Sequence, residues 1–217
     1  METVATSLSN PFGMRPPCAN RCSDDIPAVF GYGNPNADFH LIGDHPGRHG
    51  GASTGIPFTD NPASVRLLEV LASVGIGAVS DDIPTGDNLF MSYLHLCCPP
   101  DGGDPEPAMY ADLERFFDAE LRAIAAHVLM PVGPRAIEHV IKNFTAIPLS
   151  EVDPGTLHGE DLAGSGFLIV PIKEPASWTE ADATLLRETL ISIVASDYQQ
   201  EADLTRFFPT NTQYLVR

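Results

Sequence analysis

A glycine-rich segment carries side chains whose types and spacing could do chemistry. It reads Gly43-Asp-His-Pro-Gly-Arg-His-Gly-Gly-Ala-Ser-Thr-Gly-Ile-Pro-Phe-Thr-Asp60. Its glycines let backbone N–H groups come close to a ligand, and Pro46 fixes the course of the chain. No Gly-Lys-Ser/Thr follows, so this is not a phosphate loop of the nucleotide-hydrolase type. His45 and His49 have a spacing that suits a metal on a helix, but we expect the glycines to prevent a helix here.

The four cysteines form a second candidate site. Cys18 and Cys22 have C-x3-C spacing, and Cys97 and Cys98 are neighbours. All four lie in proline-rich loops, whereas a structural thiol is more often buried as a small hydrophobe. We expect no disulfides, because an intracellular chain keeps its thiols reduced. Thiolates bind zinc well, so a metal centre and four free thiols both remain open.

Alternating strands and helices are predicted to position these residues. Nearly continuous apolar runs predict strands at 39–43, 89–96, 128–133 and 166–172. Apolar residues at helical spacing predict helices at 63–74, 107–127, 134–144 and 179–196, the last capped by Thr179.

This order predicts a three-layer α/β/α sandwich around a central, mainly parallel sheet of four strands. Ligands of such sheets bind beyond the carboxyl ends of the strands. The segments that follow those ends are 43–59, 97–103, 133–135 and 173–178. We therefore expect the glycine-rich segment, the Cys97 loop and the loop after the last strand to meet.

Length and charge limit the class of protein. The 217 residues suit one domain, which we place at 28–196, between an irregular arm (1–27) and a tail (197–217). No run of residues approaches the ~18 consecutive apolar residues that a membrane helix needs. We expect a cytoplasmic protein that is a monomer. The net charge is −17, with only two lysines but ten arginines. This balance favours adaptation to high salt, which screens self-repulsion, so acidity does not exclude binding to DNA.

Several motifs together resemble the uracil-DNA glycosylase superfamily. The spacing His49-Gly-Gly-x-x-Thr-Gly-x-x-Phe58-Thr is similar to the first motif of its fifth family, and Gly31-Tyr-Gly-Asn-Pro35 to the entry segment of the fourth. Cys97 precedes Pro99-Pro100, and Pro131-Val-Gly133 precedes a helix. The likeness extends over about residues 15 to 190, in the order of the family. It suggests a divergent, salt-adapted member of haloarchaeal type, close to the iron–sulfur branches.

The resemblance implies roles for the glycine-rich segment. In that superfamily the target base is flipped out of the duplex into a pocket, where a phenylalanine stacks on it. Phe58 matches this phenylalanine, and Asp44 stands where the fourth family carries the glutamate that holds the attacking water. His49 matches a histidine of the fifth-family loop. Gly43, Pro46 and Gly47 would line the same pocket. Alternatively, Phe58 is a core residue, Asp44 a turn former and His49 solvated.

Two positions depart from the family pattern. Tyr93 stands where the fourth family carries an asparagine that reads uracil, which makes strict uracil selectivity unexpected. The second motif reads Glu174-Pro-Ala176, although active members begin it with histidine. That histidine stabilises the departing anionic base, and loss of such a donor costs about 3 kcal/mol. An ionised Glu174 would repel this anion, whereas a protonated one could donate to it, unless Lys173 or Arg48 is near.

The resemblance also implies a 4Fe–4S cluster. Cys18, Cys22 and Cys97 match three of its ligands, while the fourth position falls near Asp112. Either Cys98 or Asp112 completes the set, or the cluster has been lost. Zinc on the same cysteines, or no metal, remain alternatives.

The function implied is that of a divergent DNA glycosylase of base-excision repair. It would hydrolyse the N-glycosidic bond of a flipped-out base, with damaged or single-stranded DNA as partner. One alternative is a protein on the same scaffold that binds DNA without chemistry, because the recognition residue and the leaving-group residue have both changed. Another is a hydrolase of free nucleosides or nucleotides.

Overall fold

The computed structural model describes residues 10–18, 28–80, 83–85, 88–98, 103–124, 126–196, 201–202 and 214–215. Its helices are α1 (Pro46–His49), α2 (Pro62–Ser73), α3 (Pro107–Ala123), α4 (Gly133–Phe144) and α5 (Glu180–Ala195), with 3-10 turns at Leu149–Glu151 and Pro175–Ser177. Its strands are β1 (Tyr32–Gly33), β2 (Phe39–Gly43), β3 (Ala78–Ser80), β4 (Ile83–Thr85), β5 (Leu89–Tyr93), β6 (Val128–Pro131), β7 (Leu162–Ala163), β8 (Leu168–Ile169), β9 (Glu201–Ala202) and β10 (Tyr214–Leu215).

The central sheet has six strands in the order β1-β5-β2-β6-β8-β7. Its four inner strands are parallel, with Gly43 opposite Tyr93 and Ile42 opposite Pro131. The edge strands β1 and β7 pair antiparallel. The predicted four-stranded parallel sheet is thus confirmed as the centre of a wider one. The edge strands were missed because two residues are too few to show a period of two.

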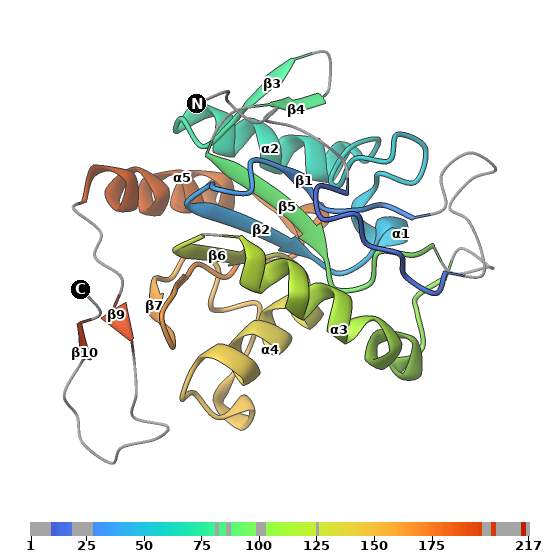
Figure 1. The fold of residues 1–217 in the computed structure, drawn as a ribbon. Coiled ribbons are helices and arrows are strands. Elements are labelled where there is room, and N and C mark those ends of the chain that lie inside the picture. The colour runs from blue at the N-terminus through green and yellow to red at the C-terminus, as the bar shows by residue number, and fades with distance from the viewer. Residues whose placement is uncertain are drawn as a thin grey trace, which may run out of the picture.

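Helices cover both faces of the sheet, as predicted for a three-layer sandwich (Figure 1). On one face, Leu41 and Met130 pack in a buried cluster with Leu71 of α2 and Leu186 of α5. On the other, Ile42 and Leu129 pack against side chains of α3 and α4. Neighbouring residues of one strand thus face opposite layers, which is why the strands read as continuous apolar runs.

Capping residues in the sequence mark where helices begin and end. Thr179 accepts a hydrogen bond from the Asp182 N–H, and Asp182 accepts one from the Thr179 N–H, so the predicted cap of α5 is a full capping box. The expectation of no helix in the glycine-rich segment was wrong, because one turn forms at Pro46–His49. Pro46 at its start presets a helical φ, and Gly50, with φ of 91°, ends it.

The domain boundaries stay predictions. Residues 1–9, 19–27, with Cys22, and most of 197–217 lie outside the described residues, as do Pro99 and Pro100. Within the described part of the chain, no helix is long and apolar enough to cross a membrane.

Candidate functional site

The carboxyl ends of the parallel strands bring the candidate residues together. Asp44 follows β2, Tyr93 ends β5, Gly133 follows β6, and Glu174 comes five residues after β8. Arg48 Nε lies 2.7 Å from Glu174 Oε2, so the glycine-rich segment and the last loop are in contact. A side-chain carbon added at Gly133 would lie 3.1 Å from Glu174 Oε2. The expected convergence is therefore present.

Asp44 is a buried carboxylate surrounded by donors. Its side chain is 4% exposed, and Oδ1 accepts a hydrogen bond from the Tyr110 hydroxyl. Arg135 Nε lies 3.7 Å from Oδ1, and an Arg48 terminal nitrogen lies 3.8 Å from Oδ2. A phenol hydroxyl and two guanidinium groups thus surround this carboxylate and fix its position, and a positioned carboxylate can act as a general base on a water molecule.

His49 is oriented by the backbone of Asp44. The Asp44 N–H donates to His49 Nδ1 at 3.1 Å, so the ring proton of the neutral imidazole must lie on Nε2. Nε2 faces Glu174 Oε1 at 3.5 Å, and the His49 side chain is only 1% exposed. The alternative that His49 is solvated was wrong, because the short helix α1 turns its ring inward.

Phe58, Tyr93 and His49 form one aromatic cluster. The His49 ring stacks on Phe58 with centroids 5.5 Å apart, and Phe58 and Tyr93 are 5.2 Å apart. The Tyr93 hydroxyl donates to the Gly50 carbonyl and accepts from the Phe58 N–H. All three rings are buried, and Phe58 has a φ of 63°, which is strained for a bulky residue. The His49 ring thus covers one face of the Phe58 ring.

The other predicted pocket residues have distinct places. A side-chain carbon at Gly43 would lie 2.6 Å from the Tyr93 ring and 2.8 Å from the Phe58 ring, so only glycine lets these rings approach the strand end. Pro46 is buried as the first residue of α1, whereas Gly47 is exposed. Gly43 and Pro46 therefore shape the site, and Gly47 faces solvent.

Glu174 forms an ion pair with Arg48 across the two loops. Burial alone would raise the pKa of Glu174, but the His49 and Arg48 contacts outweigh it and lower this pKa below its usual value. The side chain is 22% exposed and that of Arg48 is 36% exposed. The protonated form considered from the sequence is thus disfavoured, because Arg48 is near. Lys173 instead pairs with Asp182 at 2.7 Å.

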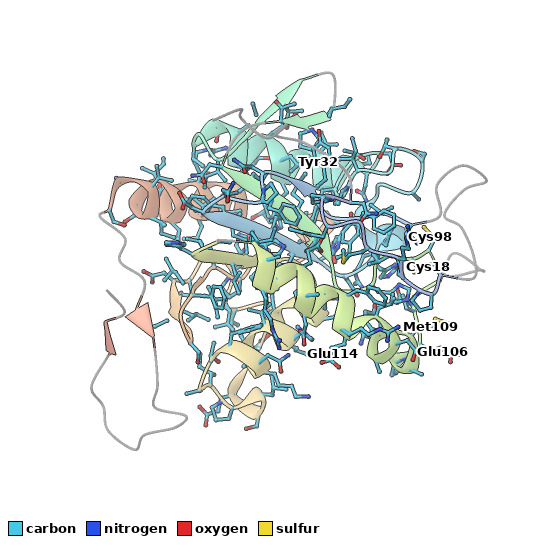
Figure 2. The ribbon with its side chains drawn as sticks, viewed as in Figure 1. Cys18, Tyr32, Cys98, Glu106, Met109 and Glu114 are labelled. Atoms are coloured by element: carbon cyan, nitrogen blue, oxygen red, sulfur yellow. A yellow bond between two sulfur atoms is a disulfide. The ribbon has the colours of Figure 1, made fainter. Side chains whose placement is uncertain are left out.

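Three of the four cysteines, Cys18, Cys97 and Cys98, lie in the described part of the chain. Cys18 and Cys97 are joined by a disulfide between residues 79 positions apart, with their Cα atoms 6.0 Å apart, and Cys98 is disulfide-bonded too. The expectation of no disulfides therefore differs from the structure, which brings these thiols within bonding distance. Figure 2 labels Cys18 and Cys98 at the same end of the molecule. Asp112 is exposed on α3, and among the described residues no group of three or more His, Cys, Asp or Glu has metal-site geometry.

Sequence reasoning missed Tyr110 and Arg135. Arg135 lies over the Tyr110 ring, 4.3 Å from its centroid, and both side chains line a cavity of about 330 Å³ between α3 and α4. One signal could have found Arg135. It stands in the first turn of α4, where the helix dipole favours acidic residues, so a cation there indicates an anionic partner. Tyr110 gives no such signal.

His45 and His95 were also not assigned to the site. His45 Nε2 lies 3.1 Å from Asp104 Oδ1, whereas His49 Nε2 faces Glu174, so the two histidines have different carboxylate partners. His95 Nδ1 lies 2.8 Å from the Cys97 carbonyl, and its ring lies 5.4 Å from that of Tyr110. Since the Tyr110 hydroxyl binds Asp44, His95 connects the cysteine loop to the Asp44 carboxylate.

Comparisons with known proteins point to one superfamily. Residues 30–191 match the model of the uracil DNA glycosylase superfamily. The chain is 30% identical over 121 residues to the type-5 uracil-DNA glycosylase of Thermus thermophilus. This aligned region covers 54% of this chain and 55% of that relative. It is 26% identical over 190 residues to the type-4 uracil-DNA glycosylase of Archaeoglobus fulgidus, covering 86% and 87%. A type-4 enzyme of Saccharolobus solfataricus is 25% identical over 152 residues, covering 69% and 66%. The chain thus spans about half the length of the first relative and most of the second.

Proposed function

Because the chain belongs to the uracil-DNA glycosylase superfamily, we propose that it is a divergent DNA glycosylase of base-excision repair. It would bind damaged DNA, flip one nucleotide out of the duplex and hydrolyse the bond between its base and sugar. One observation supports this most directly. A buried carboxylate, Asp44, lies at the carboxyl ends of the parallel strands, held by Tyr110 and two arginines. A water beside it can be deprotonated as it attacks the sugar carbon C1′.

The remaining residues of the site would hold the base. Phe58 would stack on the flipped base, and Tyr93 would shape the pocket beneath it. Because His49 covers Phe58, its ring must move before a base can stack there. His49 has two contacts to give up, the Asp44 N–H on Nδ1 and the Glu174 carboxylate on Nε2. The contact with Glu174 is long at 3.5 Å, so the Asp44 hydrogen bond and the stacking on Phe58 are the main contacts that this movement must break.

The departures from the family pattern indicate a changed specificity. Tyr93 uses its hydroxyl on two backbone groups and has no amide with which to read uracil. Glu174 replaces the histidine that donates to a departing pyrimidine. Strong selectivity for uracil is therefore not expected.

The test is single-turnover cleavage of duplex and single-stranded oligonucleotides that contain uracil, hypoxanthine or xanthine. We would assay in molar KCl, because the charge of −17 suits a salt-adapted protein. Asp44→Asn keeps the shape of the side chain but removes the base, and we expect a loss of at least about 100-fold. Product from none of these substrates, and none from duplexes that contain an alkylated purine, would remove the enzymatic proposal. Turnover of free nucleosides with no oligonucleotide binding would favour the nucleoside hydrolase instead.

A second candidate is a DNA-binding protein without chemistry. The Arg48–Glu174 ion pair and the His49 cover favour it, because together they leave no ring of the cluster open to a base. Glu174→His separates the two candidates. If the site retains catalysis, restoring the histidine should raise uracil cleavage. If the protein only binds DNA, the wild type and Glu174→His should both bind the oligonucleotides, and neither should release a base.

We also propose that Cys18, Cys22, Cys97 and Cys98 hold a 4Fe–4S cluster. Support comes from the donor set, since the thiols of Cys18 and Cys97 come into contact although they lie 79 residues apart. Such a cluster would act structurally, fastening the N-terminal arm to the loop after β5. An anaerobic absorbance spectrum with iron and zinc analysis tests this. Iron near four per chain supports the cluster, zinc near one per chain supports a zinc site, and neither metal leaves the disulfide.

A further inference from the structure

The base-facing end of the site carries a negative charge where a histidine donor is usual. Glu174 needs no proton, because Arg48 Nε binds Oε2 and His49 Nε2 faces Oε1. The two contacts lower its pKa despite partial burial, so the carboxylate is ionised at neutral pH. A carboxylate has about four lone-pair positions, and these contacts use two. Glu174 can therefore accept further hydrogen bonds from a ligand but can donate none.

The negative charge of Glu174 determines which kind of departing base the site can stabilise. A neutral pyrimidine departs as an anion, which an ionised Glu174 would repel at short range. A base that already carries a positive charge departs as a neutral molecule, and the same carboxylate attracts it before the bond breaks. An anionic residue is thus a defect for uracil but an advantage for a cationic base.

The donors and acceptors of each base further limit which bases could bind the Glu174 carboxylate. Uracil presents its single ring N–H between two carbonyl oxygens, which would face the carboxylate oxygens. A guanine ring presents an N–H next to an exocyclic amine, and two adjacent donors match the two oxygens of a carboxylate. Adenine and cytosine place a ring acceptor beside their amine, so each matches only one oxygen. Guanine derivatives alkylated at N7 combine this donor pair with a positive ring.

We propose that Glu174 is the specificity-determining residue of this site and that the site selects cationic, N7-alkylated guanine over uracil. This inference rests on the proposed glycosylase function. The bond between C1′ and N9 breaks, and its electron pair passes into the purine ring and cancels the ring charge. The water oxygen bonds to C1′, and its proton passes to Asp44. The base leaves neutral, so no leaving-group acid is needed.

The test compares release of 7-methylguanine and uracil from otherwise identical duplexes, under single-turnover conditions and after subtraction of spontaneous loss. The wild type should release 7-methylguanine at least about tenfold faster. Glu174→Gln keeps the shape but removes the charge and one acceptor, and it should slow release of 7-methylguanine by about 10- to 100-fold without slowing that of uracil. Glu160→Gln, an exposed residue, makes the same charge change and should alter neither rate.

The outcomes distinguish this inference from the proposed function. Release of uracil at a rate equal to or above that of 7-methylguanine, or an unchanged rate in Glu174→Gln, overturns the inference but leaves a glycosylase. If no base is released, the proposed function fails. In that case the inference is tested by the affinity of the protein for a duplex that contains 7-methylguanine. A 2′-fluoro sugar at the lesion prevents cleavage of the methylated base during the measurement. Equal affinity of wild type and Glu174→Gln for the lesion would overturn it, and weaker binding by the variant would support it.

Discussion

The Tyr110 hydroxyl donates a hydrogen bond to Oδ1 of Asp44, so a residue of α3 fixes the carboxylate that follows β2. Burial and the Asp44 charge raise the pKa of Tyr110, which keeps its proton and remains a donor at every physiological pH. Arg135 lies against the other side of the Tyr110 ring and near the same carboxylate oxygen. The helices on one face of the sheet thus orient the proposed water-activating group.

Tyr110→Phe should therefore slow catalysis without weakening DNA binding. A hydrogen bond to a charged group is worth about 1.5–3 kcal/mol, which corresponds to about a 10- to 100-fold lower single-turnover rate. The affinity for a lesion duplex should stay within about twofold, because Tyr110 does not face the aromatic cluster. Tyr32→Phe, a buried tyrosine of β1, is the matched control. Equal losses of rate and affinity would show that Tyr110 is only a structural residue.

Much of this site follows from sequence because it lies where strands end. Apolar runs predicted strands at 39–43 and 89–96, and the second strand ends three residues earlier, at Tyr93. The chain directions of a parallel sheet bring the ends of these strands together. Asp44, Tyr93 and Glu174 could thus be expected to meet before any contact was known. The spacing of apolar residues and the assumption of parallel strand pairing were enough to predict the fold.

What the sequence could not supply depends on side-chain directions and short distances. The charge state of Glu174 follows from Arg48 at 2.7 Å, and these residues are 126 positions apart. The inward turn of His49 depends on a single turn of helix that Pro46 begins among glycines. Tyr110 faces Asp44 because of how α3 packs across the sheet, and helical spacing alone does not define which side chain meets a distant carboxylate.

Gly43→Ala should destabilise the protein and disturb the aromatic cluster. The added methyl would lie 2.6 Å from the Tyr93 ring and 2.8 Å from the Phe58 ring, both of which are fully buried. Overpacking of this kind costs about 1–3 kcal/mol of unfolding free energy, measurable by urea denaturation. Gly155→Ala is the control, since its methyl would meet only Asp153 Oδ1 at 3.4 Å. Equal stability of the two variants would contradict the packing described at the end of β2.

The cysteine site gives a prediction that separates its two proposed fourth ligands. Asp112 is exposed on α3, whereas Cys98 adjoins Cys97, whose thiol contacts that of Cys18. Asp112→Ala should therefore keep the full iron content of anaerobically purified protein. Cys98→Ser should lose iron and absorbance near 400 nm in about the proportion of Cys18→Ser. Loss of iron in Asp112→Ala with retention in Cys98→Ser would assign the ligand to Asp112.

Glu120 predicts how stability depends on pH. It is buried in α3, and this burial raises its pKa from 4.5 to about 8, although hydrogen bonds from Ser92 and the Gly31 N–H oppose the shift. The folded protein therefore holds a proton that the unfolded chain releases above pH 4.5. The contribution of Glu120 to the free energy of unfolding should be highest near or below that pH, fall as the pH rises, and level off above about 8. His40, which binds the Ser92 hydroxyl, has a pKa lowered by burial to about 3 and acts in the opposite sense below about pH 6.5, because the unfolded chain binds a proton there that the folded protein does not.

Urea denaturation at pH 5.5 and 8.5 measures this dependence. Glu120→Gln keeps a similar shape and cannot ionise, so the stability of the wild type relative to this variant should fall between the two pH values. Glu160→Gln, an exposed residue whose charge contacts solvent, should leave the fall unchanged. The same pH dependence in both variants would show that another group releases the proton. Since Glu120 is remote from Asp44 in the chain and lies under β5, this effect should appear in stability even in a variant without catalysis, such as Asp44→Asn.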